Sequence, residues 1–171
     1  MAINLKGFKD GFLRSLPLII LIYVSISEFQ TQFYYWKIFS FNLQFILIYY
    51  LVLRDPSILG YGFIFLCGLI NEVVLSLNLG TSALSYLFVS LVAAYIRAAT
   101  VRSTLISDWF TFVIAVMGGN FITFILIKNF SDVGVTYTDL FYNSLFTFIL
   151  YPVFWFFFEL YKRGISLRLY D

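Results

Sequence analysis

The chain has 171 residues, of which 61% are hydrophobic, 22% aromatic and 12% charged, and its formal net charge is +2. A water-soluble domain of this length needs many more charged residues on its surface, so the composition indicates an integral membrane protein. The sequence contains no histidine and one cysteine, Cys67, which excludes histidine-based catalysis, histidine metal ligands and an internal disulfide.

Apolar stretches near the length of about 20 residues that crosses a bilayer recur along the chain, separated by short polar breaks. They predict an all-α integral membrane protein with six transmembrane helices in one compact bundle, a single domain over residues 1–171. The predicted helices cover residues 17–35, 41–53, 58–77, 82–99, 109–127 and 139–161.

Proline residues indicate where the first helix begins and where the second helix ends. The first helix is expected to begin at Pro17, because proline is well tolerated in the first helical turn. The segment before it, with Phe8 and Phe12 at helical spacing, is expected to lie along the membrane interface. The second helix is expected to end at "RDP", because Pro56 cannot continue a helix and disfavours helical geometry at Asp55.

The third helix carries two polar residues, Asn71 and Glu72, within a largely apolar run. In lipid, such side chains need a partner or a water-lined cavity. One interpretation is a hydrogen-bonding node that shapes a partner-binding face or a cavity. The other is an architectural carboxyl that ties this helix to a neighbour such as Asn120. Both interpretations remain open on the sequence alone.

Later helices contain further signals for caps and close packing. Gly80 is expected to give a tight exit from the third helix, and Ser82 is expected to cap the fourth. Asn120 follows two glycines in the middle of the fifth helix, which favours close packing and a hydrogen bond to another helix. Asp139 can cap the sixth helix, and Pro152 is expected to kink it.

Basic residues predict the orientation in the membrane, because cytoplasmic loops retain Lys and Arg. With six helices and a cytoplasmic N-terminus, most basic residues fall on the cytoplasmic side: Lys6, Lys9, Arg14, Arg54, Arg97, Arg102, Lys162, Arg163 and Arg168. Only Lys37 and Lys128 fall outside. The distribution predicts that both termini are cytoplasmic.

The sequence offers little for catalysis. An enzyme needs a metal cluster, a nucleophile with its base or converging acids, and Glu72 is the one acid expected deep in the bundle. A proton-coupled transporter could use one acid, whereas a channel or pump needs a denser polar stripe. We therefore expect no catalytic residue, cofactor, metal ion or nucleic acid partner. The functions that we favour are packing against other membrane proteins and binding of a small ligand.

Two segments resemble the bacterial rod-shape-determining MreD family. These are "YYLVLRDPSI", residues 49–58, and "GLINEVVLSLNLGTSAL", residues 68–84, in which Glu72 stands where the family usually has aspartate. A further difference is Asn78, where the family has proline, and Asp55 separates an arginine and a proline that are adjacent in the family. The tail "YPVFWFFFELYKRG" is also similar to the family pattern.

The resemblance implies a non-enzymatic scaffold of the peptidoglycan-elongation machinery in the bacterial inner membrane. Its expected direct partner is the bitopic MreC, with the actin-like MreB, a SEDS-type glycan polymerase and a class B penicillin-binding protein reached indirectly. In that interpretation Glu72 and Gly80 shape the outer end of a helical hairpin. Three arginines are expected to line the cytoplasmic side, for contacts with filaments or membrane lipids: Arg54, Arg97 and Arg102.

A transport function is the alternative. Substrate-binding subunits of energy-coupling-factor transporters have six helices in a similar length, and the MreD family is thought to share their fold. Such a subunit for a vitamin or metal ion should present converging polar and aromatic residues at its outer cavity. The outer loops of this chain contain few polar residues. The segment "AAYIRAA" in the fourth helix keeps this alternative open, because an alanine-rich face could bind a coupling subunit.

Overall fold

The computed structural model describes residues 5–26, 41–56, 58–100, 104–130 and 137–170, with side chains between Ser15 and Gly164 in these ranges. The described residues form six α-helices and no β-strand. The helices are α1 (Leu5–Ile26), α2 (Leu43–Arg54), α3 (Tyr61–Val74), α4 (Thr81–Ala99), α5 (Leu105–Phe130) and α6 (Tyr137–Tyr170). The prediction of an all-helical chain is confirmed over these ranges.

Three helices, α4, α5 and α6, are long and apolar enough to cross a membrane. The other three contain shorter apolar segments: Ser15–Ile26, Leu43–Arg54 and Tyr61–Val74. At 1.5 Å per residue, the 12 residues of α2 cover about 18 Å, less than the hydrocarbon thickness of about 30 Å. The structure therefore supports a membrane protein, with three helices of spanning length in the part described.

The predicted helix boundaries need several corrections. Helix α1 begins at Leu5 and contains Pro17, so the expected interfacial segment and first span are one continuous helix; residues 27–35 lie outside the described ranges. Helix α3 is shorter than predicted at both ends, and α5 begins one turn earlier than predicted. Helix α6 continues past Pro152 to Tyr170, well beyond the predicted end.

Helix α2 has clear start and stop signals. Asn42 is its N-cap, and the side chain of Asn42 accepts a hydrogen bond from Phe45 N at 3.2 Å. At the other end, Asp55 N donates to Leu51 O, and the backbone of Asp55 is no longer helical. The predicted end of this helix before Pro56 is therefore confirmed.

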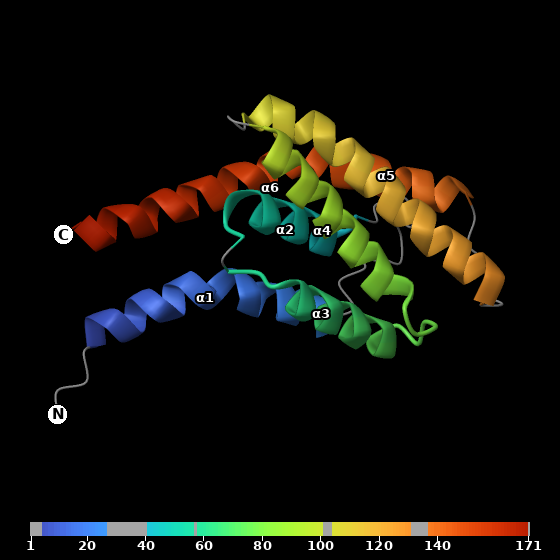
Figure 1. Ribbon diagram of the computed structural model, residues 1–171, viewed down its shortest axis with the longest axis horizontal. Helices are drawn as coiled ribbons and strands as arrows, with labels where there is room; N and C mark the ends of the chain where they lie inside the picture. Colours follow the sequence, from blue (N-terminus) through green and yellow to red (C-terminus); the bar gives the residue numbers. More distant parts are fainter. Residues whose placement is uncertain (1–4, 27–40, 57, 101–103, 131–136, 171) are drawn as a thin grey trace, which may run out of the picture.

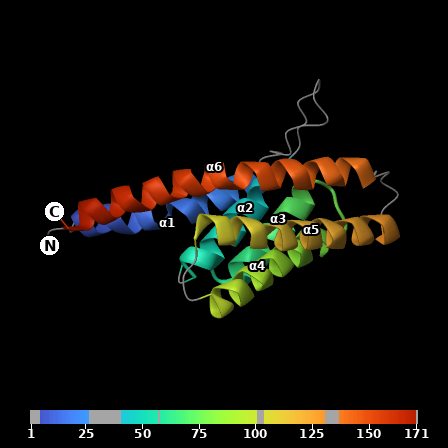
Figure 2. The ribbon, with the colours of Figure 1, turned by 90° about the horizontal axis from the view of Figure 1, so that it is seen from above.

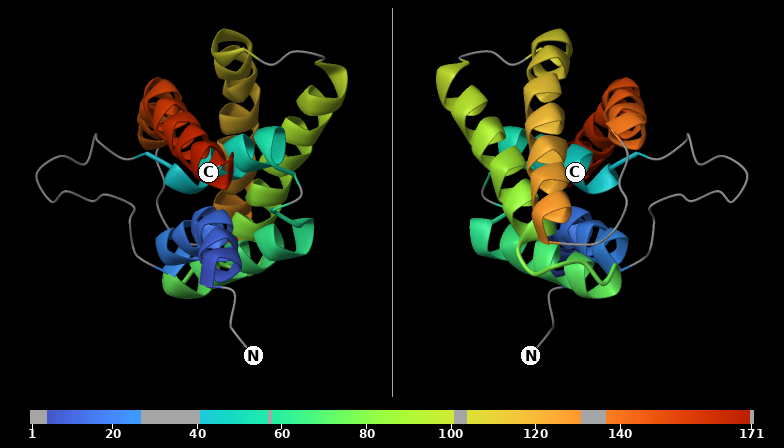
Figure 3. Two further views of the ribbon diagram at one scale, coloured as in Figure 1. Left: turned by 90° about the vertical axis from the view of Figure 1, so that its left-hand side faces the viewer. Right: turned by 90° about the vertical axis from the view of Figure 1, so that its right-hand side faces the viewer.

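The helices form two groups with α2 between them (Figure 1). Helices α1 and α3 lie together on one side and α5 and α6 on the other, while α4 runs between the two groups and packs against both α3 and α5 (Figure 3). Helix α2 packs against α1, α4, α5 and α6, and all residues from Gln44 to Leu53 are buried. The start of α1 and the end of α6 lie at the same side of the molecule (Figure 1).

The outer surface is strongly apolar. Large hydrophobic side chains are exposed along α5 and α6, including Phe110, Met117, Phe121, Phe141 and Phe157. An apolar surface of this kind on a water-soluble monomer would mark an interaction site, whereas in a membrane protein lipid covers it. The buried core and this surface together agree with a bundle that is solvated by lipid.

Candidate functional site: two buried carboxylates

The contact between α3 and α4 depends on small residues at helical spacing. Gly68, Asn71 and Glu72 lie at positions i, i+3 and i+4 of α3, so they share one face of the helix. A Cβ atom on Gly68 would lie 2.8 Å from the nitrogen of Ala83 and closer still to its Cα atom. Only glycine therefore allows the two helix backbones to approach this closely.

This close approach places the Glu72 carboxylate at the N-terminus of α4. One oxygen, Oε2, accepts a hydrogen bond from Gly80 N, and the other, Oε1, accepts one from Ala83 N, both at 2.7 Å. The side chain of Glu72 is completely buried. Its charge is stabilised by two backbone donors and by the partial positive charge at the start of the helix.

Glu72 supplies the capping side chain that the N-cap residue of α4 lacks. Gly80 is the N-cap residue, with φ 99° in the left-handed region, and has no side chain to accept from the first turn. A capping side chain normally accepts from the second or third helical N–H, and Ala83 is the third helical residue. The carboxylate of the preceding helix therefore caps α4 and closes the α3–α4 hairpin.

The prediction that Ser82 caps α4 is wrong. Helix α4 begins at Thr81, and Ser82 lies in its first turn, where Ser82 Oγ accepts a hydrogen bond from Asn71 Nδ2 at 3.0 Å. Thr81 Oγ1 instead donates to Asn78 O at 2.9 Å. The predicted tight exit at Gly80 is confirmed, because its positive φ favours glycine.

Asn120 is not the partner of Glu72 that the sequence suggested. Its Nδ2 atom donates to Ser144 Oγ on α6 at 2.7 Å and more weakly to Asn143 Oδ1 at 3.4 Å. A Cβ on the adjacent Gly119 would lie 2.8 Å from the ring of Phe45. The predictions of close packing and a hydrogen bond across a helix contact are confirmed here, with α6 as the acceptor.

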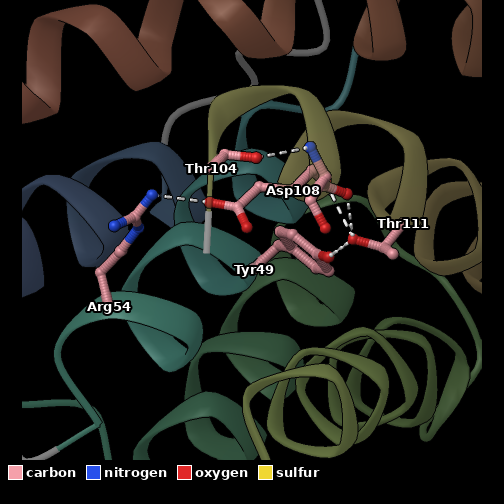
Figure 4. Close-up of polar contacts among 6 residues, drawn as sticks. Tyr49, Arg54, Thr104, Asp108 and Thr111 are labelled. Carbon is pink, nitrogen blue, oxygen red and sulfur yellow. Dashed lines mark hydrogen bonds and ion pairs between the residues drawn. The ribbon is translucent and has the colours of Figure 1, made fainter. Parts of the chain in front are cut away.

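A second buried carboxylate, Asp108, lies in the first turn of α5. Arg54 Nη2 at the C-terminus of α2 donates to Asp108 Oδ2 at 2.8 Å, and this ion pair joins two helices (Figure 4). The Asp108 side chain is 1% exposed and that of Arg54 is 21% exposed. The acid at the start of α5 and the base at the end of α2 both complement the dipole of their own helix.

Aromatic and hydroxyl side chains surround this ion pair. The OH groups of Tyr49 and Thr111 share a hydrogen bond of 2.7 Å, and Thr111 Oγ1 also contacts the backbone oxygen of Asp108 (Figure 4). The Arg54 guanidinium carbon lies 5.6 Å from the centre of the Trp155 ring. The cluster therefore combines side chains from α2, α5 and α6.

This cluster leaves polar atoms without a close partner. Asp108 Oδ1, Tyr151 OH and Trp155 Nε1 are buried and make no hydrogen bond of normal length with the described residues, although the indole of Trp155 does interact with the Asp108 carboxylate. Buried polar groups normally have a protein or water partner, so Tyr151 OH retains hydrogen-bonding capacity for water or a small polar group.

The predicted arginine Arg97 does not join this ion pair. Arg97 Nη1 donates to Val52 O at 3.1 Å and so ties α4 to the end of α2. Arg102 lies outside the described residues. Lys162 instead reaches Asp55, with an Nζ to Oδ2 distance of 2.8 Å. Arg54, Arg97 and Lys162 thus all bind around the C-terminus of α2.

Asp108 is the main residue that sequence reasoning missed. The fifth helix was predicted to begin at residue 109, which placed Asp108 in a loop. A signal was present, because an acid directly before an apolar run is typical of the first turn of a helix. Its pairing with Arg54 had no signal, because the two residues are 54 positions apart.

Within the described ranges, no group of three His, Cys, Asp or Glu side chains is placed to hold a metal ion. The two buried carboxylates accept hydrogen bonds from backbone N–H groups and pair with an arginine. Comparison of the chain with known protein families, with curated proteins and with solved structures finds no match.

Proposed function

We propose that this protein is a non-enzymatic scaffold of the bacterial cell-shape and peptidoglycan-elongation machinery, with an MreC-like bitopic protein as its direct partner. The observation that carries the proposal is the position of Glu72. The strongest candidate for chemistry in the sequence binds Gly80 N and Ala83 N with its two oxygens and so stabilises a helical hairpin. Its use is architectural, as a scaffold requires.

We further propose that the six helices lie in the inner membrane with both termini on the cytoplasmic side. The start of α1 and the end of α6 lie at the same side of the molecule (Figure 1). Of the basic side chains that the structure describes, Arg54, Arg97, Lys162 and Arg163 gather at one end of the bundle, and Lys128 lies at the other. Positive charge on the cytoplasmic side favours this orientation.

Co-purification tests the scaffold role. Tagged wild-type protein, produced in a rod-shaped bacterium that lacks its own MreD, should retain MreC in mild detergent and restore rod shape. Glu72→Ala should lose both properties, because the hairpin loses its two charge-assisted hydrogen bonds.

The control is Arg163→Gln, which removes a charge from a 74% exposed side chain of α6 and should leave both properties intact. The proposal fails if well-folded wild-type protein neither retains MreC nor restores rod shape. It also fails if Glu72→Ala behaves as wild type in both assays.

A second proposal is a substrate-binding subunit of an energy-coupling-factor transporter. The observation in its favour is the exposed end of α4, where Tyr95, Ala98 and Ala99 form a surface that a coupling subunit could cover. Saturable binding of a vitamin or a metal ion by the purified protein would support this function. Such binding, without co-purification of MreC, would replace the scaffold proposal.

A further inference from the structure

A groove of about 410 Å³ lies on the outer surface between α5 and α6. The two helices run side by side in the bundle (Figure 2). The side chains that matter for the argument are Met117, Phe121 and Phe124 on α5 and Tyr137, Phe141 and Leu145 on α6. The volume is in the range of about 300–1,000 Å³ that is common for small-molecule sites.

The lining of the groove selects for an apolar occupant. Met117 and Phe121 are 60% and 63% exposed, so the walls are open to the surroundings of the protein. Three polar side chains line the groove: Asn120 and Ser144 hydrogen bond to each other at 2.7 Å, and the Tyr137 hydroxyl accepts a hydrogen bond from Lys128 Nζ at 3.4 Å. The Asn120 donor is therefore already used, and the groove offers mainly hydrocarbon contact.

A cation lies at one end of the groove. Lys128 Nζ is 5.7 Å from the centre of the Phe124 ring and 5.9 Å from that of Tyr137, and both rings line the groove. The centroids of the Phe124 and Tyr137 rings lie 4.5 Å apart. The exposed ammonium group of Lys128 is thus held next to the point where the apolar lining stops.

The dimensions match one leaflet of a bilayer. From Val113 to Phe124 the groove follows α5 for about 16 Å, at 1.5 Å per residue, close to half of the hydrocarbon thickness of about 30 Å. Lys128 lies one helical turn further along α5. If α5 crosses the bilayer, Lys128 reaches the headgroup level while the groove faces the acyl chains of the same leaflet.

We propose that the α5–α6 groove binds one acyl chain of an anionic phospholipid, whose phosphate pairs with Lys128. The argument is complementarity: a hydrocarbon slot of one-leaflet length ends at a positive charge, and an anionic phospholipid has both features in this order. The other described basic side chains lie at the opposite end of the bundle and cannot serve this groove. The inference needs α5 and α6 to cross a membrane but does not depend on a role in cell shape.

Native mass spectrometry of the full chain tests the charge component. The protein is released from detergent with a defined excess of phosphatidylglycerol or phosphatidylcholine. Wild type should retain one phosphatidylglycerol more tightly than phosphatidylcholine. Lys128→Gln should weaken phosphatidylglycerol retention about fivefold, the effect of one basic residue near an anionic bilayer, and leave phosphatidylcholine unchanged. The control Arg163→Gln removes an exposed charge at the other end and should have no effect.

A second pair of variants tests the groove. Met117→Trp should fill the groove and weaken the retention of both lipids. Ile114→Trp places the same ring on an exposed position of α5 that does not line the groove, and it should retain lipid as wild type does. Circular dichroism and the melting temperature should be measured for both variants to show that they are folded.

Several results would overturn the inference. Equal retention of the two lipids by wild type, or equal effects of Lys128→Gln and Arg163→Gln, would show only general lipid association. Competition by glycerol phosphate as effective as that by the lipid would indicate a simple anion site. A photocrosslinker at Leu145 that captures a protein helix in native membranes, and no phospholipid, would assign the groove to a partner protein.

Discussion

The two buried carboxylates of this protein lie beside the starts of two successive helices but are used differently. Glu72 comes from the helix before α4, and both of its oxygens accept backbone N–H groups. Asp108 belongs to α5 itself; one oxygen pairs with Arg54, and the other makes no close hydrogen bond with the described residues. The first carboxylate is bound by backbone donors, whereas the second is bound by the side chains of Arg54 and Trp155.

The difference also concerns distance along the chain. Glu72 binds residues 8 and 11 positions away, so the α3–α4 hairpin can form from local contacts. Asp108 binds a residue 54 positions away, and this contact requires α2 and α5 to be packed together. A carboxylate in the same apolar setting can therefore stabilise a local hairpin or depend on the assembled bundle.

The largest effect on stability is expected for Arg54→Ala, which leaves Asp108 buried without its charged partner. The loss should be about 3–5 kcal/mol in the free energy of unfolding, measured in mixed micelles. The double variant Arg54→Ala/Asp108→Ala should recover a large part, because the buried charge is then gone. If Arg54→Ala costs less than about 1 kcal/mol, the pair behaves as a surface ion pair and the comparison fails.

Glu72→Gln should have the next largest effect. The amide oxygen can still accept one backbone N–H, but the amide NH₂ group then faces the other donor. We expect a loss of about 1.5–3 kcal/mol, the usual range for a hydrogen bond to a charged group. Arg163→Gln serves as the control on α6, because the Arg163 side chain is 74% exposed and lies 3.8 Å from Glu159. Equal losses for the two variants would contradict the capping role of Glu72.

Gly68→Ala tests the close approach that positions Glu72. The added methyl group would clash with the backbone of Ala83, and overpacking of this kind costs about 1–3 kcal/mol. Gly62→Ala on the same helix meets no atom within 4 Å and should leave the melting temperature unchanged or slightly raised. A melting temperature for Gly68→Ala at or above that of Gly62→Ala would show that α3 and α4 tolerate a wider spacing.

The smallest effect is expected at the exposed pair Lys162–Asp55. Its side chains are 47% and 28% exposed, so Asp55→Asn should cost only about 0–1 kcal/mol. Because salt screens exposed charges, the difference from wild type should shrink at high ionic strength. Thermal unfolding at low and high salt measures this effect, and a large loss independent of salt would place the pair with Arg54–Asp108.

The helical class was readable from the sequence, because each helix contains an apolar run, but several helix boundaries were not. Pro56 ends α2 as expected, and Gly80 separates α3 from α4. The start of α1 was not readable, because Pro17 is equally compatible with the first turn of a helix and with the continuous helix that is observed.

The site was only partly predictable. Glu72 stood out as a carboxylate in an apolar run, but its partners are backbone N–H groups, which every residue except proline carries, so the sequence gives no signal for them. Asn120 was a reasonable partner by residue type, yet it binds α6. The packing that decides between these partners depends on Gly68 and on the three-dimensional arrangement of α3, α4 and α5.

Residue-resolved hydrogen exchange tests the capping of α4 by Glu72 most directly. In wild-type protein in micelles, the amides of Gly80 and Ala83 should be protected, because both donate to the buried carboxylate. In Glu72→Ala these two amides should exchange much faster, while amides in the middle of α5 keep their protection. Equal exchange of Gly80 and Ala83 in the two proteins would contradict the claim that Glu72 closes the hairpin.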